Sequence, residues 1–207
     1  MSLPPDLKSQ FPLLSQTING HEIVYLDSAA SSQKPLVVIE AMNNYYRTIN
    51  ANVHRGAYEI AAQATESMEQ ARVRVARFIG APSPNEIVFT KNATESFNLI
   101  ARSWGGKNLG PNDVVLISDM EHHANIVPWQ ILAAEKGFEL RWIPLTPDGH
   151  LDLSQLDQLL DGVKMVSITA MSNVLGTLNP VREIADQAHS LGAVSYTHLT
   201  LPTILLV

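Results

Sequence analysis

Apolar residues are spaced along this chain in two ways, one typical of amphipathic helices and one typical of buried strands. Over residues 57–78 they recur mostly every three or four positions, which predicts one long helix, and Gly80 is placed to end it. A similar spacing predicts a helix over residues 36–49. Residues 1–20 are expected to form an extended or loosely helical arm, followed by a short strand at 21–26.

In the rest of the chain, short apolar runs alternate with helical segments. The predicted strands cover residues 86–90, 114–118, 139–143 and 164–169. The predicted helices cover residues 94–104, 126–136, 153–160 and 181–191. Alternation of this kind is typical of a mostly parallel sheet with helices on both faces, so the sequence predicts an α/β fold.

The composition fits a globular protein that binds neither nucleic acid nor a membrane. Apolar residues make up 45% of the 207 positions, enough to bury a substantial core. The net charge of −6 and the lack of a basic block disfavour nucleic-acid binding. No segment reaches the roughly 18 apolar residues of a membrane helix. The N-terminus has no signal-peptide pattern, so we expect a cytoplasmic protein.

Polar loops follow or precede several of the predicted elements. One contains Asn92 and Thr94 before the helix at 94–104, a second contains His122 after the strand at 114–118, and a third contains Asn173 after the strand at 164–169. Because the carboxyl ends of parallel strands meet at one edge of a sheet, we expect these loops to converge. A helix N-terminus suits a phosphate group, although Asn and Thr there also serve as ordinary helix caps.

A metal site is not predicted. The chain has no cysteine, which excludes thiolate ligands, disulfides and a cysteine nucleophile within it. His122 and His123 are adjacent and would point in different directions, and no His-x-x-x-His or carboxylate spacing supports zinc. On residue type alone, a loop histidine is usually structural or solvated, and Asn173 before Gly176 could be an ordinary turn residue.

The run Glu-His-His-Ala-Asn-Ile-Val-Pro-Trp at 121–129 changes this picture. It closely resembles a segment of the SUF-type cysteine desulfurases, a class V aminotransferase-like group that depends on pyridoxal 5′-phosphate (PLP) and includes selenocysteine lyases. Further motifs match in the same order from about residue 20 to Ala193. The resemblance implies the large domain of the type I PLP-dependent transferase fold, preceded by an N-terminal arm.

The resemblance also implies roles for the residues of the three loops. His122 would stack on the pyridine ring of PLP and move protons during turnover, and His123 would lie behind it. Thr94 and the backbone N–H of Ala93 would hold the phosphate, with Ala93 standing where the family often has threonine. Asn173 would form a hydrogen bond to the phenolic oxygen of the cofactor.

Two earlier segments, at residues 27–35 and 52–56, match loops that line the substrate entrance in the same family. Ala29 and Ala30 are small enough to permit close approach of a substrate to the backbone. His54 and Arg55 would line the entrance, although an arginine of this kind can also be an ordinary surface ion-pair former.

The resemblance implies a longer parent enzyme. That parent would convert L-cysteine to L-alanine and leave a persulfide on the enzyme for iron–sulfur cluster assembly, or would act on L-selenocysteine. It would be a homodimer and pass sulfur to a SUF-type acceptor protein. The family's PLP-binding lysine follows a histidine, and none of the seven histidines here is followed by lysine. We therefore expect this chain, without that lysine and the catalytic cysteine, to be inactive by itself.

We expect three segments. Residues 1–56 would form the arm and the entrance loops, and residues 57–193 part of the PLP-binding domain. Residues 194–207 contain no Asp, Glu, Lys or Arg and lack the family's Asp-Gly-Ala-Gln. They resemble the translation of a sequencing adapter, so we expect a non-native tail, although residues 194–199 could form a strand on pattern alone.

Two other interpretations stay open at this point. Another PLP enzyme of the same fold, such as a class V aminotransferase, an epimerase or a kynureninase, would share many of these motifs. A non-enzymatic interaction domain could also keep such a scaffold.

Overall fold

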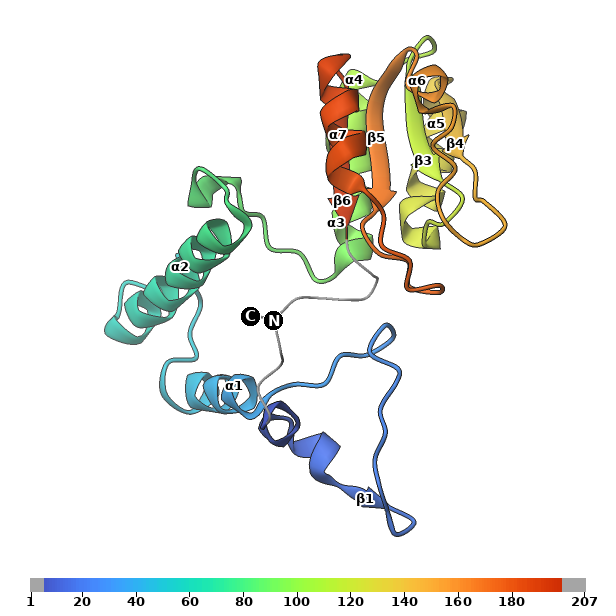
Figure 1. Cartoon of the computed structure of the whole chain (residues 1–207). Helices are drawn as coiled ribbons and strands as arrows, with labels where there is room; N and C mark the ends of the chain where they lie inside the picture. The colour runs from blue at the N-terminus through green and yellow to red at the C-terminus, as the bar shows by residue number, and fades with distance from the viewer. Residues whose placement is uncertain (1–5, 199–207) are drawn as a thin grey trace. The chain divides into compact units, whose positions relative to one another are not determined.

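The computed structural model describes residues 6–198, which form two compact units (Figure 1). The first unit contains residues 6–89 and the second contains residues 90–198. The start of the predicted arm at 1–5 and the part of the predicted tail at 199–207 lie outside the described residues.

The first unit is built mainly from two helices, α1 (Leu36–Thr48) and α2 (Glu59–Ile79), as the apolar spacing predicted. Gly80 ends α2 in the left-handed conformation (φ 72°), and its N–H donates to carbonyl groups of the last turn. The remaining elements are short: 3₁₀ turns at Leu7–Gln10, Pro12–Ser15 and Pro84–Glu86, and the strands β1 (Thr17–Ile18) and β2 (His21–Glu22).

Two predicted strands differ from the structure: one is shorter than predicted and the other is absent. The strand expected at 21–26 stops at Glu22, because β1 pairs with only two residues of β2, and Val24 and Leu26 are 79% and 90% exposed. The strand expected at 86–90 is irregular. The guanidinium of Arg72 donates to the Ile87 carbonyl over 2.5 Å. This side chain therefore takes the place of the backbone N–H that a neighbouring strand would offer to that carbonyl.

The second unit contains a four-stranded parallel sheet with the order β4-β3-β5-β6. Its strands are β3 (Val114–Ser118), β4 (Glu139–Ile143), β5 (Val163–Thr169) and β6 (Val194–His198). The first three confirm the predicted strands. The fourth shows that the start of the predicted tail does form a strand, in register with β5.

Helices cover both faces of this sheet, which confirms the predicted α/β fold (Figure 1). They are α3 (Ala93–Ile100), continued by a π-helical turn (Ala101–Gly105) and α4 (Gly106–Asn108), then α5 (Val127–Lys136), α6 (Leu156–Leu159) and α7 (Val181–Ser190). The helix predicted at 153–160 shrinks to α6. The carboxylate of Asp152 accepts from the Ser154 N–H, which favours a local turn there over a helical start.

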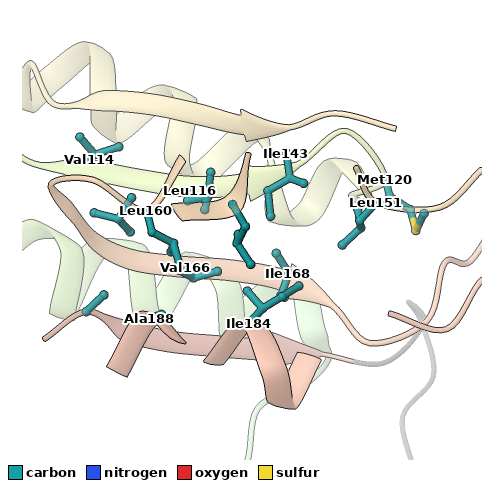
Figure 2. Packing of buried hydrophobic residues seen from close by; sticks show 13 residues of the cluster. Val114, Leu116, Met120, Ile143, Leu151, Leu160, Val166, Ile168, Ile184 and Ala188 are labelled. Atoms are coloured by element: carbon teal, nitrogen blue, oxygen red, sulfur yellow. The ribbon is translucent and has the colours of Figure 1, made fainter. Parts of the chain in front are cut away.

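Alternate residues of β3 serve the two faces of the sheet. Val114 and Leu116 join the cluster under α6 and α7, which also contains Val166 and Ile184 (Figure 2). Val115 and Ile117 join the opposite cluster, where Trp129 and Leu132 of α5 pack. A strand buried on both faces accounts for the uninterrupted apolar run in the sequence. Within the described residues, no helix is both long enough and apolar enough to cross a bilayer.

Candidate active site

The order of the strands creates a switch point between β3 and β5. From β3 the chain moves outward on one side to β4, and from β5 it moves outward on the other side to β6. The loops that leave β3 and β5 therefore diverge from neighbouring strands. In open parallel sheets, ligands commonly bind at such a point on the carboxyl edge. The first loop carries His122 and the second carries Asn173, so the structure brings these predicted loops to one edge (Figure 1).

The loop after β3 is anchored by the carboxylate of Glu121, whose side chain is fully buried. One oxygen, Oε1, accepts from the Ser118 hydroxyl over 2.6 Å and from the Thr169 N–H over 2.8 Å. The other, Oε2, accepts from the side-chain amide of Asn125 over 2.7 Å and lies 2.8 Å from Nε2 of His198. A buried carboxylate is tolerated where such partners compensate for the lost water.

Asn125 extends this network into β5 and α5. Its Oδ1 accepts from the indole N–H of Trp129 over 3.0 Å and from the Ser167 hydroxyl over 2.7 Å. Its Nδ2 donates to the Ser167 carbonyl over 3.1 Å as well as to Glu121. Because both ends of the amide are engaged, the orientation of this side chain is fixed.

His122 lies between these two anchors and is half-buried. Its Nδ1 accepts from the Ala124 N–H over 3.1 Å, and it caps a short 3₁₀ turn at His123–Asn125. Burial of the imidazole, with smaller contributions from His123 and His198, lowers the pKa of His122 below the ordinary value of 6.5. The ring is therefore neutral near pH 7, and its Nε2 is the nitrogen left to meet a ligand.

His123 differs from its neighbour. Its side chain is exposed, and its ring lies 6.2 Å from the His122 ring between centroids, at an interplanar angle of 78°. The two imidazoles thus face different directions, as adjacent histidines outside a regular element should. Among residues 6–198, no group of three or more histidines or carboxylates is arranged to hold a metal ion.

The N-terminus of α3 presents free backbone donors. Asn92 caps the helix by accepting from the Glu95 N–H over 2.9 Å, and the Glu95 carboxylate accepts from the Lys91 N–H over 2.6 Å. The N–H groups of Ala93 and Thr94 have no acceptor within residues 6–198. Ala93 packs with Phe97 and Ala124, which places this helix start beside the His122 loop.

Asn173 lies in a tight turn beyond β5. The Ser172 hydroxyl accepts from the N–H groups of Val174 and Leu175 at 3.2 and 3.0 Å, which fixes the turn. The Asn173 side chain is half-buried and forms no hydrogen bond with any residue in 6–198. Its amide is therefore available to a ligand at the carboxyl edge.

The predicted entrance residues all lie in the first unit. Ala29 is half-buried, Ala30 and Arg55 are exposed, and His54 has a left-handed backbone (φ 62°). The His54 N–H donates to the Thr65 hydroxyl over 3.0 Å, and its Nε2 lies 3.2 Å from the Glu69 carboxylate. Helix α2 therefore holds this loop at two points one turn apart.

Sequence reasoning missed the network around Glu121. It treated Glu121 and Asn125 only as letters of a motif and gave them no role. The sequence did contain one signal for this network: Glu121 and Asn125 are four residues apart in a polar loop that follows a buried strand. Their partners Ser167 and Thr169 are more than forty residues away in the chain, and nothing local marks them.

Comparison with known proteins places this arrangement in a family. Residues 24–197 match the aminotransferase class-V family. The chain belongs to the aminotransferase class-V family. The match covers most of both units, from the segment before Ala29 into β6.

The chain is similar to curated cysteine desulfurases of bacteria. It is 52% identical over 194 residues to a cysteine desulfurase of Serratia proteamaculans, covering 93% of this chain and 48% of that protein. It is 48% identical over 193 residues to a probable cysteine desulfurase of Synechocystis, covering 93% of this chain and 46% of that protein. The chain thus spans about half the length of the curated relatives it matches.

Solved structures agree with this assignment. A cysteine desulfurase of Thermococcus onnurineus superposes with a TM-score of 0.85 at 38% identity, covering 95% of this chain and 47% of that one. The cysteine desulfurase CsdA of Escherichia coli superposes with a TM-score of 0.79 at 34% identity, covering 95% of this chain and 48% of that one. The predicted transferase fold and the predicted resemblance to cysteine desulfurases are both confirmed.

Proposed function

We propose that this chain carries the cofactor-binding loops of a PLP-dependent cysteine desulfurase, whose longer parent converts L-cysteine to L-alanine and retains the sulfur as an enzyme persulfide. The observation that supports this most is that the start of α3, where the N–H groups of Ala93 and Thr94 have no acceptor among residues 6–198, packs against the loop that carries the neutral imidazole of His122. A ligand made of a pyridine ring and a phosphate group needs hydrogen-bond donors for the phosphate and an uncharged flat ring to stack on.

The described residues fit PLP in three respects. The N–H groups of Ala93 and Thr94 and the hydroxyl of Thr94 would hold the phosphate at the positive end of the α3 dipole. His122 would stack on the pyridine ring, and its Nε2 would be free to hold or move a proton. The unbonded amide of Asn173 would donate to the phenolic oxygen. When bound, PLP supplies an electron sink for bond changes at the substrate Cα.

The substrate and the partners are also part of the proposal. The names of the relatives point to L-cysteine, and L-selenocysteine is the alternative substrate. His54 and Arg55 would line the entrance to the site, together with Ala29 and Ala30. We further propose a homodimeric, cytoplasmic parent that passes its sulfur to a SUF-type acceptor protein.

The phosphate site can be tested on the chain as it stands by comparing PLP with pyridoxal, which lacks the phosphate. Binding is followed by the quenching of tryptophan fluorescence. We expect PLP to bind about tenfold or more tightly than pyridoxal, as expected for a ligand that gains charge-assisted hydrogen bonds.

The variant Ala93→Pro isolates the backbone donor. Proline is well tolerated at the first position of a helix, and Asn92 before it is already extended (φ −168°, ψ 172°). The variant should lower the affinity for PLP and leave that for pyridoxal unchanged. Thr94→Val is the companion variant: it keeps the N–H and removes the hydroxyl, and it should also weaken the binding of PLP without affecting that of pyridoxal. Equal affinity of the wild-type chain for PLP and pyridoxal would contradict the proposed phosphate site and favour a non-enzymatic interaction domain.

A further inference from the structure

We infer that Glu121 is a positioning residue of the site: its buried carboxylate fastens the loop that carries His122 to the carboxyl ends of β5 and β6. The fastening itself is independent of the cofactor. Only the importance of His122 rests on the proposed function.

The contacts of Glu121 reach four parts of the unit. Ser118 ends β3, Asn125 ends the 3₁₀ turn, Thr169 ends β5 and His198 ends β6. All four lie within 2.6 to 2.8 Å of a carboxylate oxygen. Two carboxylate oxygens accept about four hydrogen bonds in all. The carboxylate is therefore saturated by partners from separate segments and holds their ends together.

An amide could not take the place of this carboxylate. In one orientation the NH₂ group of a glutamine would face the Thr169 N–H, which is a fixed backbone donor. In the other it would face the NH₂ group of Asn125. Asn125 cannot turn over in response, because its Oδ1 already accepts from Trp129 and Ser167. Either orientation leaves a buried donor opposite a donor.

The consequence for His122 follows from its place in the chain. Glu121 precedes it, and Asn125 follows it by three residues, so both ends of the segment 122–124 are held. Within that segment, the Ala124 N–H donates to Nδ1 of His122. Protection of the Ala124 amide from exchange with solvent therefore reports whether the imidazole is held in place.

Hydrogen exchange can separate this role from a general contribution to stability. The measured quantity is the exchange rate of the Ala124 and Thr169 amides, each divided by that of Leu116 in the centre of β3. Global unfolding exposes all three amides together, so a loss of global stability raises neither ratio. Local release of the loop raises the two ratios.

Three variants of the whole chain are compared. Glu121→Gln should raise both ratios by about tenfold or more, the effect of leaving a buried donor without an acceptor. Ser118→Ala removes one donor to Oε1 and should raise them less, and it decides the question if Glu121→Gln fails to fold. Leu160→Ala, in the core cluster under α6 and α7, should lower stability without raising either ratio.

Unchanged ratios in both Glu121→Gln and Ser118→Ala, or an equal rise in Leu160→Ala, would overturn the inference. These outcomes are distinct from failure of the proposed function. If the ratios respond as expected and the wild-type chain does not prefer PLP to pyridoxal, then only the proposed function fails.

Discussion

Thr169 and Glu121 are joined across the carboxyl ends of two neighbouring parallel strands, where the Thr169 N–H donates to Oε1 of Glu121 over 2.8 Å. β5 ends at Thr169, and its last N–H is thus satisfied by a side chain from the loop after β3. The same carboxylate binds Asn125, so the two loops of the switch point share one buried polar network. The stability of the site should depend on this network.

Replacing Asn125 with alanine should therefore destabilise the second unit. The substitution leaves the Trp129 indole N–H and the Ser167 hydroxyl without their acceptor and removes one donor to Glu121. Each buried group that loses its partner costs about 1–3 kcal/mol. The free energy of unfolding in urea, followed by tryptophan fluorescence, should fall by at least that amount. The exposed Asn98 of α3 is the control, and Asn98→Ala should change it by less than about 0.5 kcal/mol.

Two adjacent glycines should respond in opposite ways to alanine. A Cβ at Gly105 would lie 2.8 Å from Leu132 and 3.2 Å from Trp129, and both of these side chains are fully packed. Gly105→Ala should thus cost about 1–3 kcal/mol in the free energy of unfolding. A Cβ at Gly106 would meet no atom closer than 4.0 Å, and Gly106 has right-handed helical angles. Gly106→Ala should therefore stabilise by about 0.4–1 kcal/mol. Similar changes in the free energy of unfolding for the two variants would contradict the packing described around the π-helical turn.

The titration of His122 gives a prediction with a definite sign. Because its pKa is lowered in the folded chain, the unfolded chain binds a proton more readily as the pH falls below 6.5. The contribution of His122 to stability is thus present above that pH and is lost as the pH falls through the folded pKa. The midpoint, measured by NMR from the ring protons, should lie below the ordinary value of 6.5.

The control for this titration is His123→Gln. It removes the second cause of the lowered pKa, and burial, the largest cause, remains. The midpoint of His122 should rise but stay below the ordinary value of 6.5. A midpoint at or above 6.5 in the wild-type chain would mean that the imidazole is not buried as described.

The sequence predicted the central sheet well because its strands are marked locally. The strands Val114–Ser118 and Glu139–Ile143 have the predicted bounds, because each is a short run with apolar residues that lies between turn residues. The run at 86–90 has the same local character but fails, because Arg72 takes its carbonyl group and the described residues give it no neighbouring strand. Propensity indicates where a strand can form, and pairing decides whether it does.

The candidate site was predicted in part for a similar reason. Parallel topology brings His122 and Asn173 to one edge whatever their neighbours are, so their placement follows from the order of the elements. The network that holds His122 joins Glu121 to Thr169 across 48 positions. Such contacts depend on the packing of two loops, which local pattern does not specify. The roles of His122 and His123 in turnover stay predictions.

Those roles can be compared in a longer protein, in which residues 1–193 of this chain replace the corresponding part of the Serratia proteamaculans cysteine desulfurase. His122→Ala should lower turnover by about 10²–10⁴-fold, the usual contribution of general acid–base catalysis. His123→Ala should lower it less, because its ring is exposed and faces away from that of His122. A larger loss at His123 would mean that the two histidines are assigned the wrong way round.

Whether these loops serve a cysteine desulfurase is tested most directly by alanine formation in that same protein. It is supplied with PLP, L-cysteine and a reductant, and the alanine released is quantified against the unmodified Serratia enzyme. We expect alanine to form in repeated turnovers and to require the residues of this chain at the site. A folded protein that binds PLP and releases no alanine from L-cysteine would contradict the proposed function.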